Sequence, residues 1–144
     1  MAVEIPGKVV GILVAAADLR TKQFYCVKVD SAAKIALCSA AGESVFGVLQ
    51  NDPNTGEAAA VMTTGVTKAV AGAALAAGAY VTTDANGKLK AVVLGRTDTS
   101  DAGAAADALL GSNVLGQLLE ASTADGDIVT LSLGARAPQV TTAS

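Results

Sequence analysis

The residues of this chain that could carry catalysis lack their usual partners. The sequence contains no histidine, the side chain best suited to acid–base chemistry near neutral pH. Ser31 and Lys34 have the Ser-x-x-Lys spacing of β-lactam-processing enzymes, in which the motif opens a helix of a much larger α/β protein. Here the two residues fall in a predicted hairpin turn, and no Gly-x-Ser-x-Gly motif occurs. The sequence therefore predicts that the chain is not an enzyme.

Thirteen acidic residues could supply paired carboxylates or metal ligands. Most of them fall in predicted turns, where Asp is favoured because it caps backbone N–H groups. Asp125 with Asp127, and Asp98 with Asp101, could offer oxygen ligands, but neither stretch has EF-hand spacing or a repeated Gly/Asp nonapeptide. We therefore expect no metal and no cofactor, with a calcium ion held by these acids as the alternative.

The two cysteines, Cys26 and Cys38, allow two interpretations. They could form a disulfide or redox pair, or they could be small buried apolar residues in neighbouring strands. Their spacing matches no CxxC motif. We expect two reduced, buried side chains, consistent with synthesis in a reducing cytoplasm.

Charge and hydropathy argue against nucleic acid and membrane as direct partners. The ten basic residues are scattered and the net charge is −3, so the basic footprint of a phosphate-binding protein is missing. The apolar run at 9–17 is preceded by Glu4, Pro6 and a single Lys8. Because this run is far shorter than the ~20 residues that span a bilayer, we interpret it as a buried strand and not as a signal or membrane segment.

Most of the chain is predicted to form short strands between turn signals. Asn86-Gly87 indicates a hairpin with a type I′ turn. Residues 71–77 and 100–110 could each form a short helical turn, since both are rich in Ala. The triplet AAG recurs at 40–42 and 76–78, which is too little to indicate a repeat. The predicted strands are 8–15, 24–29, 34–38, 45–50, 58–63, 65–70, 80–83, 88–94, 114–121 and 127–133.

This pattern predicts an all-β protein, an antiparallel β-sandwich of jelly-roll type or, as the alternative, a small β-barrel. We expect an N-terminal arm at 1–7, a single β domain at 8–134 and a C-terminal tail at 135–144. Half of the residues are hydrophobic, but only 3% are aromatic and much of the apolar content is Ala. Since such a core buries little area per side chain, we expect a subunit that completes its burial against neighbours.

The middle of the chain resembles a family of small phage proteins, catalogued as DUF2190 and taken to be capsid cement proteins. The resemblance covers about residues 24–95 and depends on the order and spacing of motifs. The motifs are FGVLQNDP at 46–53, GEAA at 56–59, TGVTKAV at 64–70, AAG at 76–78 and DANGK at 84–88.

The resemblance implies a decoration protein on the outer surface of an icosahedral phage head. Its partners would be the major capsid protein, whose subunits it bridges, and a second or third copy of itself, as a homodimer or homotrimer. We expect the chain termini to provide interfaces, because terminal arms can become ordered on contact with neighbours. The candidate interface residues are Val3, Glu4, Ile5, Pro6, Arg136, Pro138 and Val140.

Two other functions remain open from the sequence. One is an accessory structural subunit of a phage tail or fibre, built on the same β fold. The other is a carbohydrate-binding β-sandwich, which would need exposed aromatic platforms. Only Tyr25 and Tyr80 could provide such platforms, since the chain has no Trp.

Overall fold

The computed structural model describes residues 2, 4–92 and 113–134 of the chain. These residues form eleven strands and no helix. The strands are β1 (Ile5–Pro6), β2 (Val9–Val14), β3 (Cys26–Val29), β4 (Ile35–Leu37), β5 (Gly47–Leu49), β6 (Ala58–Met62), β7 (Gly65–Val70), β8 (Tyr80–Thr83), β9 (Leu89–Ala91), β10 (Gly116–Leu118) and β11 (Ile128–Leu133).

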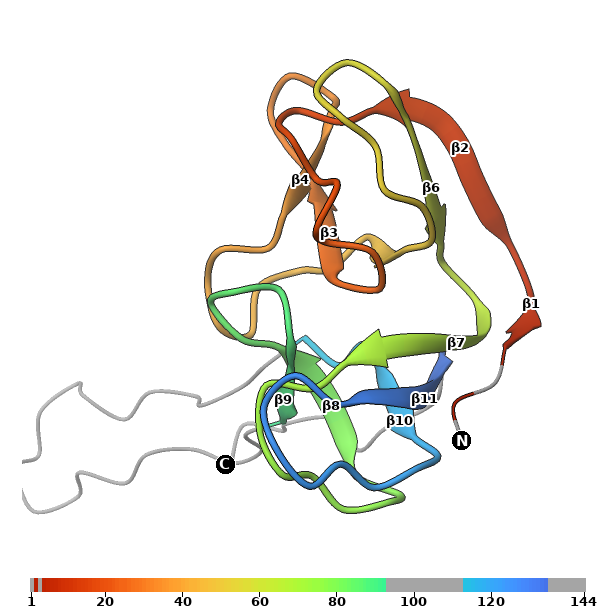
Figure 1. The fold of residues 1–144 in the computed structure, drawn as a ribbon, viewed down its shortest axis with the longest axis vertical. Helices are drawn as coiled ribbons and strands as arrows, with labels where there is room; N and C mark the ends of the chain where they lie inside the picture. The colour runs from red at the N-terminus through yellow and green to blue at the C-terminus, as the bar shows by residue number, and fades with distance from the viewer. Residues whose placement is uncertain (1, 3, 93–112, 135–144) are drawn as a thin grey trace, which may run out of the picture.

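The strands form two antiparallel sheets that pack on each other, so the predicted all-β sandwich is confirmed. The first sheet has the order β2-β6-β5-β3-β4, and the second has the order β1-β7-β11-β10-β8-β9. Figure 1 shows the first sheet above the second, with β1 and β2 running along one side of both. Among the described residues, neither strand order forms a closed ring, and only one isolated bridge links the residue after each unit's first strand to its third strand. The alternative of a small closed barrel is therefore wrong.

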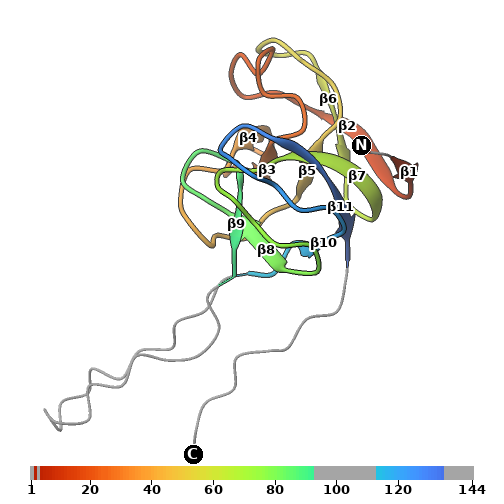
Figure 2. The ribbon, with the colours of Figure 1, turned by 60° about the horizontal axis from the view of Figure 1, so that its bottom comes forward.

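The two sheets have the same topology. We call β2–β6 the first unit and β7–β11 the second unit. Numbered within its own unit, each sheet places its strands in the order one-five-four-two-three. Strand β1 is added outside this pattern, on the free edge of β7. The fold is therefore a tandem duplication of one five-stranded unit. Figure 2 shows the strands of both units from a second direction.

The turn between the second and third strands is built in the same way in both units. In the first unit, Asp30 Oδ1 accepts bonds of 2.9 Å from the backbone N–H groups of Ala32 and Lys34. In the second unit, Asp84 Oδ1 accepts bonds of 2.8 and 2.9 Å from those of Asn86 and Lys88. These bonds make the sequences DSAAK and DANGK two copies of one Asp-capped turn.

A glycine opens the fourth strand of each unit for the same steric reason. A Cβ at Gly47 would collide with the carbonyl oxygen of Met62, and a Cβ at Gly116 would collide with that of Ser132. Both carbonyls belong to the fifth strand of the same unit. Each glycine thus permits a close backbone approach that a side chain would prevent.

Each unit also builds its core from equivalent positions. The core of the first unit contains Ala15, Leu19, Val27, Ile35, Leu49, Ala59 and Val61. Strand register and turn contacts match each of these seven residues with one residue of the second unit. The matching residues, in the same order, are Ala71, Leu75, Val81, Leu89, Leu118, Val129 and Leu131, and all of them are buried. For example, Ala15 bridges Ile35 and Ala71 bridges Leu89, both in parallel. The duplication therefore extends from topology to packing.

Two sequence predictions are corrected by the structure. Residues 71–77 are not helical, because Ala71 and Leu75 form isolated bridges to Leu89 and Ser122. The turn at 84–87 is not type I′, since Gly87 has φ 79° but Asn86 is not in the positive-φ region. Strand β1, within the predicted arm, was not expected. The candidate helical turn at 100–110 and the tail at 135–144 lie outside the described residues.

The two Asp-capped turns predict unequal effects of one substitution. Asp84→Ala should lower the free energy of unfolding by about 3 kcal/mol, because Gly87 in its turn is buried against the first unit. Asp30→Ala should cost only about 1 kcal/mol, because Ser31 to Lys34 are exposed. Urea denaturation of the two variants measures the difference. Equal losses would show that the two turns are equally integrated into the fold.

Candidate interaction surface

The described part of the chain contains no assembled catalytic or metal site. No group of three or more Cys, Asp or Glu residues lies close enough together there to hold a metal ion. The Asp127 carboxylate is occupied by the N–H and hydroxyl of Thr123 and the N–H of Ala124, and Asp125 pairs with Lys88 at 2.9 Å. Asp98 and Asp101 lie outside the described residues. Asp125 and Asp127 therefore serve in an ion pair and a turn.

The two cysteines are free and buried, with Cys26 in β3 and Cys38 directly after the adjacent β4. Burial raises the pKa of the Cys38 thiol to about 11, and it also raises the pKa of Cys26. Both groups are therefore protonated at neutral pH and poor nucleophiles. Ser31 and Lys34 are both exposed in the Asp30 turn, as expected. Among the described residues, no helix is long and apolar enough to span a bilayer.

The candidate interface residues at the N-terminus are partly held in the second sheet. Ile5 and Pro6 form β1 and lie opposite Val66 and Gly65 of β7. Glu4 is exposed, and Ile5 is 65% exposed. The other candidates, Val3, Arg136, Pro138 and Val140, lie outside the described residues. The part of the arm that is placed therefore presents an apolar side chain from a fixed strand.

Strands β1 and β2 form one ribbon that carries three of the large exposed hydrophobic side chains. These are Ile5, Val9 at 46% exposure and Ile12 at 87% exposure. Ile12 lies at a β-bulge, where the register of β2 against β6 shifts between Val10 and Leu13. Single exposed apolar residues are common on protein surfaces, but three on one edge ribbon make it a candidate interaction surface.

A row of side chains crosses the solvent-facing side of the second sheet. Neighbouring strands place Tyr80 opposite Gln117, and Gln117 opposite Ser132. The N–H of Val92 bonds to the carbonyl of Tyr80 at 3.0 Å and continues the row on β8's other side. We call Val92, Tyr80, Gln117 and Ser132 the second-unit row. All four are only partly buried, so the row is accessible, and the sequence analysis did not identify it.

The equivalent row of the first sheet is completely buried. It consists of Cys38, Cys26, Val48 and Met62, joined by the same register and by a 3.1 Å bond from Cys38 N–H to the Cys26 carbonyl. Each of these side chains is at most 1% exposed. They pack against the core of the second unit. We call this set the first-unit row.

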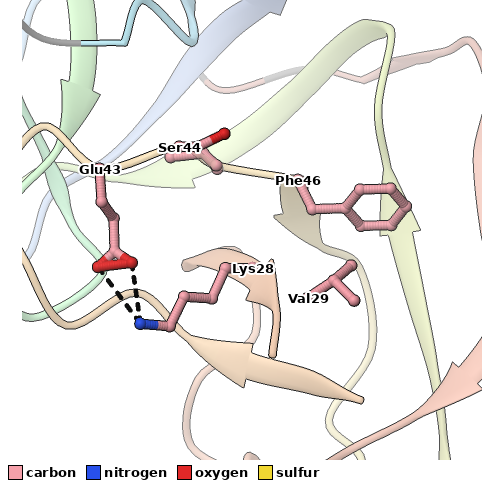
Figure 3. A pocket seen from close by; sticks show the side chains of 6 residues that line it. Lys28, Val29, Glu43, Ser44 and Phe46 are labelled. Carbon is pink, nitrogen blue, oxygen red and sulfur yellow. Dashed lines mark hydrogen bonds and ion pairs between the residues drawn. The ribbon is translucent and has the colours of Figure 1, made fainter. Parts of the chain in front are cut away.

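A groove of about 360 Å³ opens between β3 and the 43–46 segment. Figure 3 shows Lys28 and Glu43 paired on one side, with Val29 and Phe46 on the other. Lys28 Nζ lies 2.9 Å from Glu43 Oε1 and donates to Ser39 Oγ at 2.9 Å. A second groove of about 260 Å³ shares Ser44, Val45 and Phe46 and extends to Thr63 and Gly134.

Glu43 also organises the 39–43 turn of the first unit, which contacts the second unit. Its Oε2 accepts bonds from the N–H groups of Ser39 and Ala40 at 3.0 and 2.6 Å. Burial opposes ionisation of Glu43, but the bonds from Lys28, Ser39 and Ala40 outweigh burial and lower its pKa. Gly42, in the same turn, donates to the Thr83 carbonyl of β8 at 2.9 Å. The ion pair in the groove therefore has a structural role.

Removing the charge of Glu43 should weaken this turn in a pH-dependent way. Because folding lowers the Glu43 pKa, its stabilisation is present above the ordinary value of 4.5 and is lost as the pH falls through the folded-state value. Glu43→Gln should lower the unfolding free energy by about 1–2 kcal/mol at pH 7. The difference from the unsubstituted chain should shrink below about pH 4. Denaturation across this pH range, with Asp52→Asn as the control, measures the effect. A constant difference at all pH values would contradict it.

Comparison with known proteins identifies the fold. No family model matches the sequence, and no curated protein matches it. Among solved structures, the chain is similar to one described as the head fiber gp8.5 N base in bacteriophage phi29. The TM-score is 0.58, and the match covers 88% of this chain and 95% of that chain. With 18% identical residues, the chain shares its fold with the base of a phage head fibre.

Proposed function

We propose that this chain is a structural protein of a phage virion that binds the outer surface of the head. One observation carries the proposal: the whole fold is shared with the base of a phage head fibre, over 95% of that base. The chain also has exposed apolar residues on an edge ribbon, both cysteines are buried, and Asp127 is occupied by bonds within its own turn. These features suit a protein that works by packing against other subunits.

Within this class we propose a cement role, in which the protein bridges neighbouring major capsid proteins. The motif resemblance over residues 24–95 supports membership of the DUF2190-like cement proteins. The N-terminal ribbon supports this role physically. Ile5 follows the exposed Glu4 and lies on β1, which is paired with β7. Several weak contacts of this kind add up when a shell offers many identical sites.

A fibre-anchoring base is the second candidate, favoured by the nature of the structural neighbour. Both roles require binding to an assembled head, but only the cement role requires that binding strengthens the shell. A sugar-binding role has less support. Tyr80 lies in the second-unit row, and Tyr25 lies under the Lys22 ammonium group, 4.9 Å from the ring centre.

Co-sedimentation with heads that lack the protein separates these functions. The proposal predicts saturable binding, at a stoichiometry commensurate with the lattice, and little binding to unassembled coat protein. A cement protein should raise the temperature of DNA release by several degrees, whereas a fibre base should bind without this effect. Absence of binding to intact heads would refute both roles.

The Ile5 side chain provides a direct test of the ribbon. Ile5→Asp should weaken head binding at least 10-fold, since it places a charge in an apolar contact. It should change the unfolding free energy by less than about 0.5 kcal/mol, because the side chain is mostly exposed. Ile128→Asp is a matched control, as Ile128 is 51% exposed on β11. Equal binding by both variants would exclude the ribbon as the contact with the head.

A further inference from the structure

We propose that a second copy of this chain docks head-to-tail on the second-unit row, through its own Asp30 turn and the outer side of its β2. The proposal goes beyond the proposed function, and it gives surfaces to the homodimer or homotrimer that the motif resemblance implies. It follows from the duplication, because the chain already contains one such contact between its own two units.

The internal contact is made by two elements of the second unit. The first is the Asp84 turn, whose Gly87 carbonyl accepts a 2.7 Å bond from the N–H of Cys26. The second is β7, where the Val70 N–H donates to the Phe24 carbonyl at 3.1 Å and Lys68 Nζ lies 5.8 Å from the centre of the Phe24 ring. Together these elements cover the first-unit row.

The contact is not reciprocal within the chain. If the two units faced each other symmetrically, the Asp30 turn would cover the second-unit row in return. Instead, Ser31, Ala32, Ala33 and Lys34 are all exposed, and the second-unit row is only partly buried. One molecule therefore has two unused surfaces of complementary kind, at opposite ends of the tandem repeat. A heterologous contact between copies satisfies both of them.

The exposure of Ile12 has an explanation in this arrangement. Its position on β2 corresponds to Lys68 on β7, because Val14 and Val70 lie opposite the first residues of β6 and β11. Phe24, covered by Lys68, corresponds to Gly78, since both have positive φ and donate to Leu49 and Leu118 respectively. In the proposed contact, Ile12 of the docking copy would cover Gly78 of the copy that presents its second-unit row. Gly78 has no side chain that would obstruct Ile12.

The sizes of two facing positions also agree with repeated docking. Within the chain, Gly87 lies against Leu37, and a Cβ at Gly87 would lie 2.6 Å from Leu37 Cδ1. In the proposed contact, the equivalent of Gly87 is Ala33 and the equivalent of Leu37 is Ala91. The larger turn residue thus meets the smaller strand residue. Within the chain a small turn residue meets a large strand residue, whereas in the proposed contact two residues of intermediate size would meet.

Tyr80 is the side chain on which the contact should depend most. It replaces Cys26 of the first-unit row, so the second contact is larger and more polar than the first. An aromatic ring with a hydroxyl group is typical of energetically dominant interface residues. Gln117 and Ser132 supply polar groups beside it, as expected for a contact between separately folded copies.

Cysteine cross-linking between copies tests the direction of docking. Ala33→Cys and Ala91→Cys would be mixed as separate proteins and oxidised with glutathione disulfide. Head-to-tail docking predicts a disulfide between the two different variants and little cross-linking of either variant with itself. Ala124→Cys replaces Ala33→Cys in the control mixture, because Ala124 is an exposed turn residue. The native cysteines are buried and should not react.

Sedimentation of Tyr80→Lys provides the second measurement. The substitution should raise the dissociation constant of self-association about 30-fold, and Thr21→Lys, at an exposed position of the first unit, should leave it unchanged. A monomeric parent chain would overturn the inference. Self-cross-linking of Ala33→Cys alone would overturn it as well. Head-to-tail association without binding to phage heads would refute the proposed function and leave this inference intact.

Discussion

Burial of the first-unit row against the second unit is the contact on which the rest of the structure depends. Cys38, Cys26, Val48 and Met62 form a fully apolar surface, and in an isolated first unit they would face water. A five-stranded unit with so exposed a face would be marginally stable, because small sheets need a partner layer. The Gly87 carbonyl and the Gly42 N–H place the two units by backbone bonds, and the core side chains then fill the space between them.

The duplication explains why a chain with few aromatic residues can fold. Each unit surrounds a small core of seven aliphatic side chains, and the shared layer joins the second core to the first-unit row. Large side chains are not needed when each layer is thin. Because the described part of the chain has only two units, no third unit covers the second-unit row. A covering subunit would bury this row further, which fits the proposed structural role in a shell.

Much of the fold could be predicted from the sequence, because β propensity and turn residues are local signals. The ten expected strands all correspond to strands in the described residues, with ends that differ by a few positions. The duplication was missed because the two AAG triplets are not equivalent. Ala76 to Gly78 correspond to Lys22 to Phe24, and the conserved geometry lies in backbone bonds rather than in identical residues. Helix propensity at 71–77 was overridden by bridges to distant segments.

The candidate surface was less predictable than the fold. Ile5 was expected at an interface, but its pairing with Val66 depends on β7, which follows much later in the chain. The second-unit row depends on the register of β8, β10 and β11, and no local pattern reports such a register. The Lys28–Glu43 pair likewise joins β3 to a turn that comes later in the chain, so it depends on the tertiary fold.

The central claim, that this chain is a structural protein on the outside of a phage head, is tested most directly by imaging. Electron cryomicroscopy of heads saturated with the purified chain should show the two-unit fold on the outer surface, repeated at lattice positions. Strand β1, which carries Ile5, should face the coat protein. Heads without ordered density for the chain, or with density on the inner surface alone, would contradict the claim.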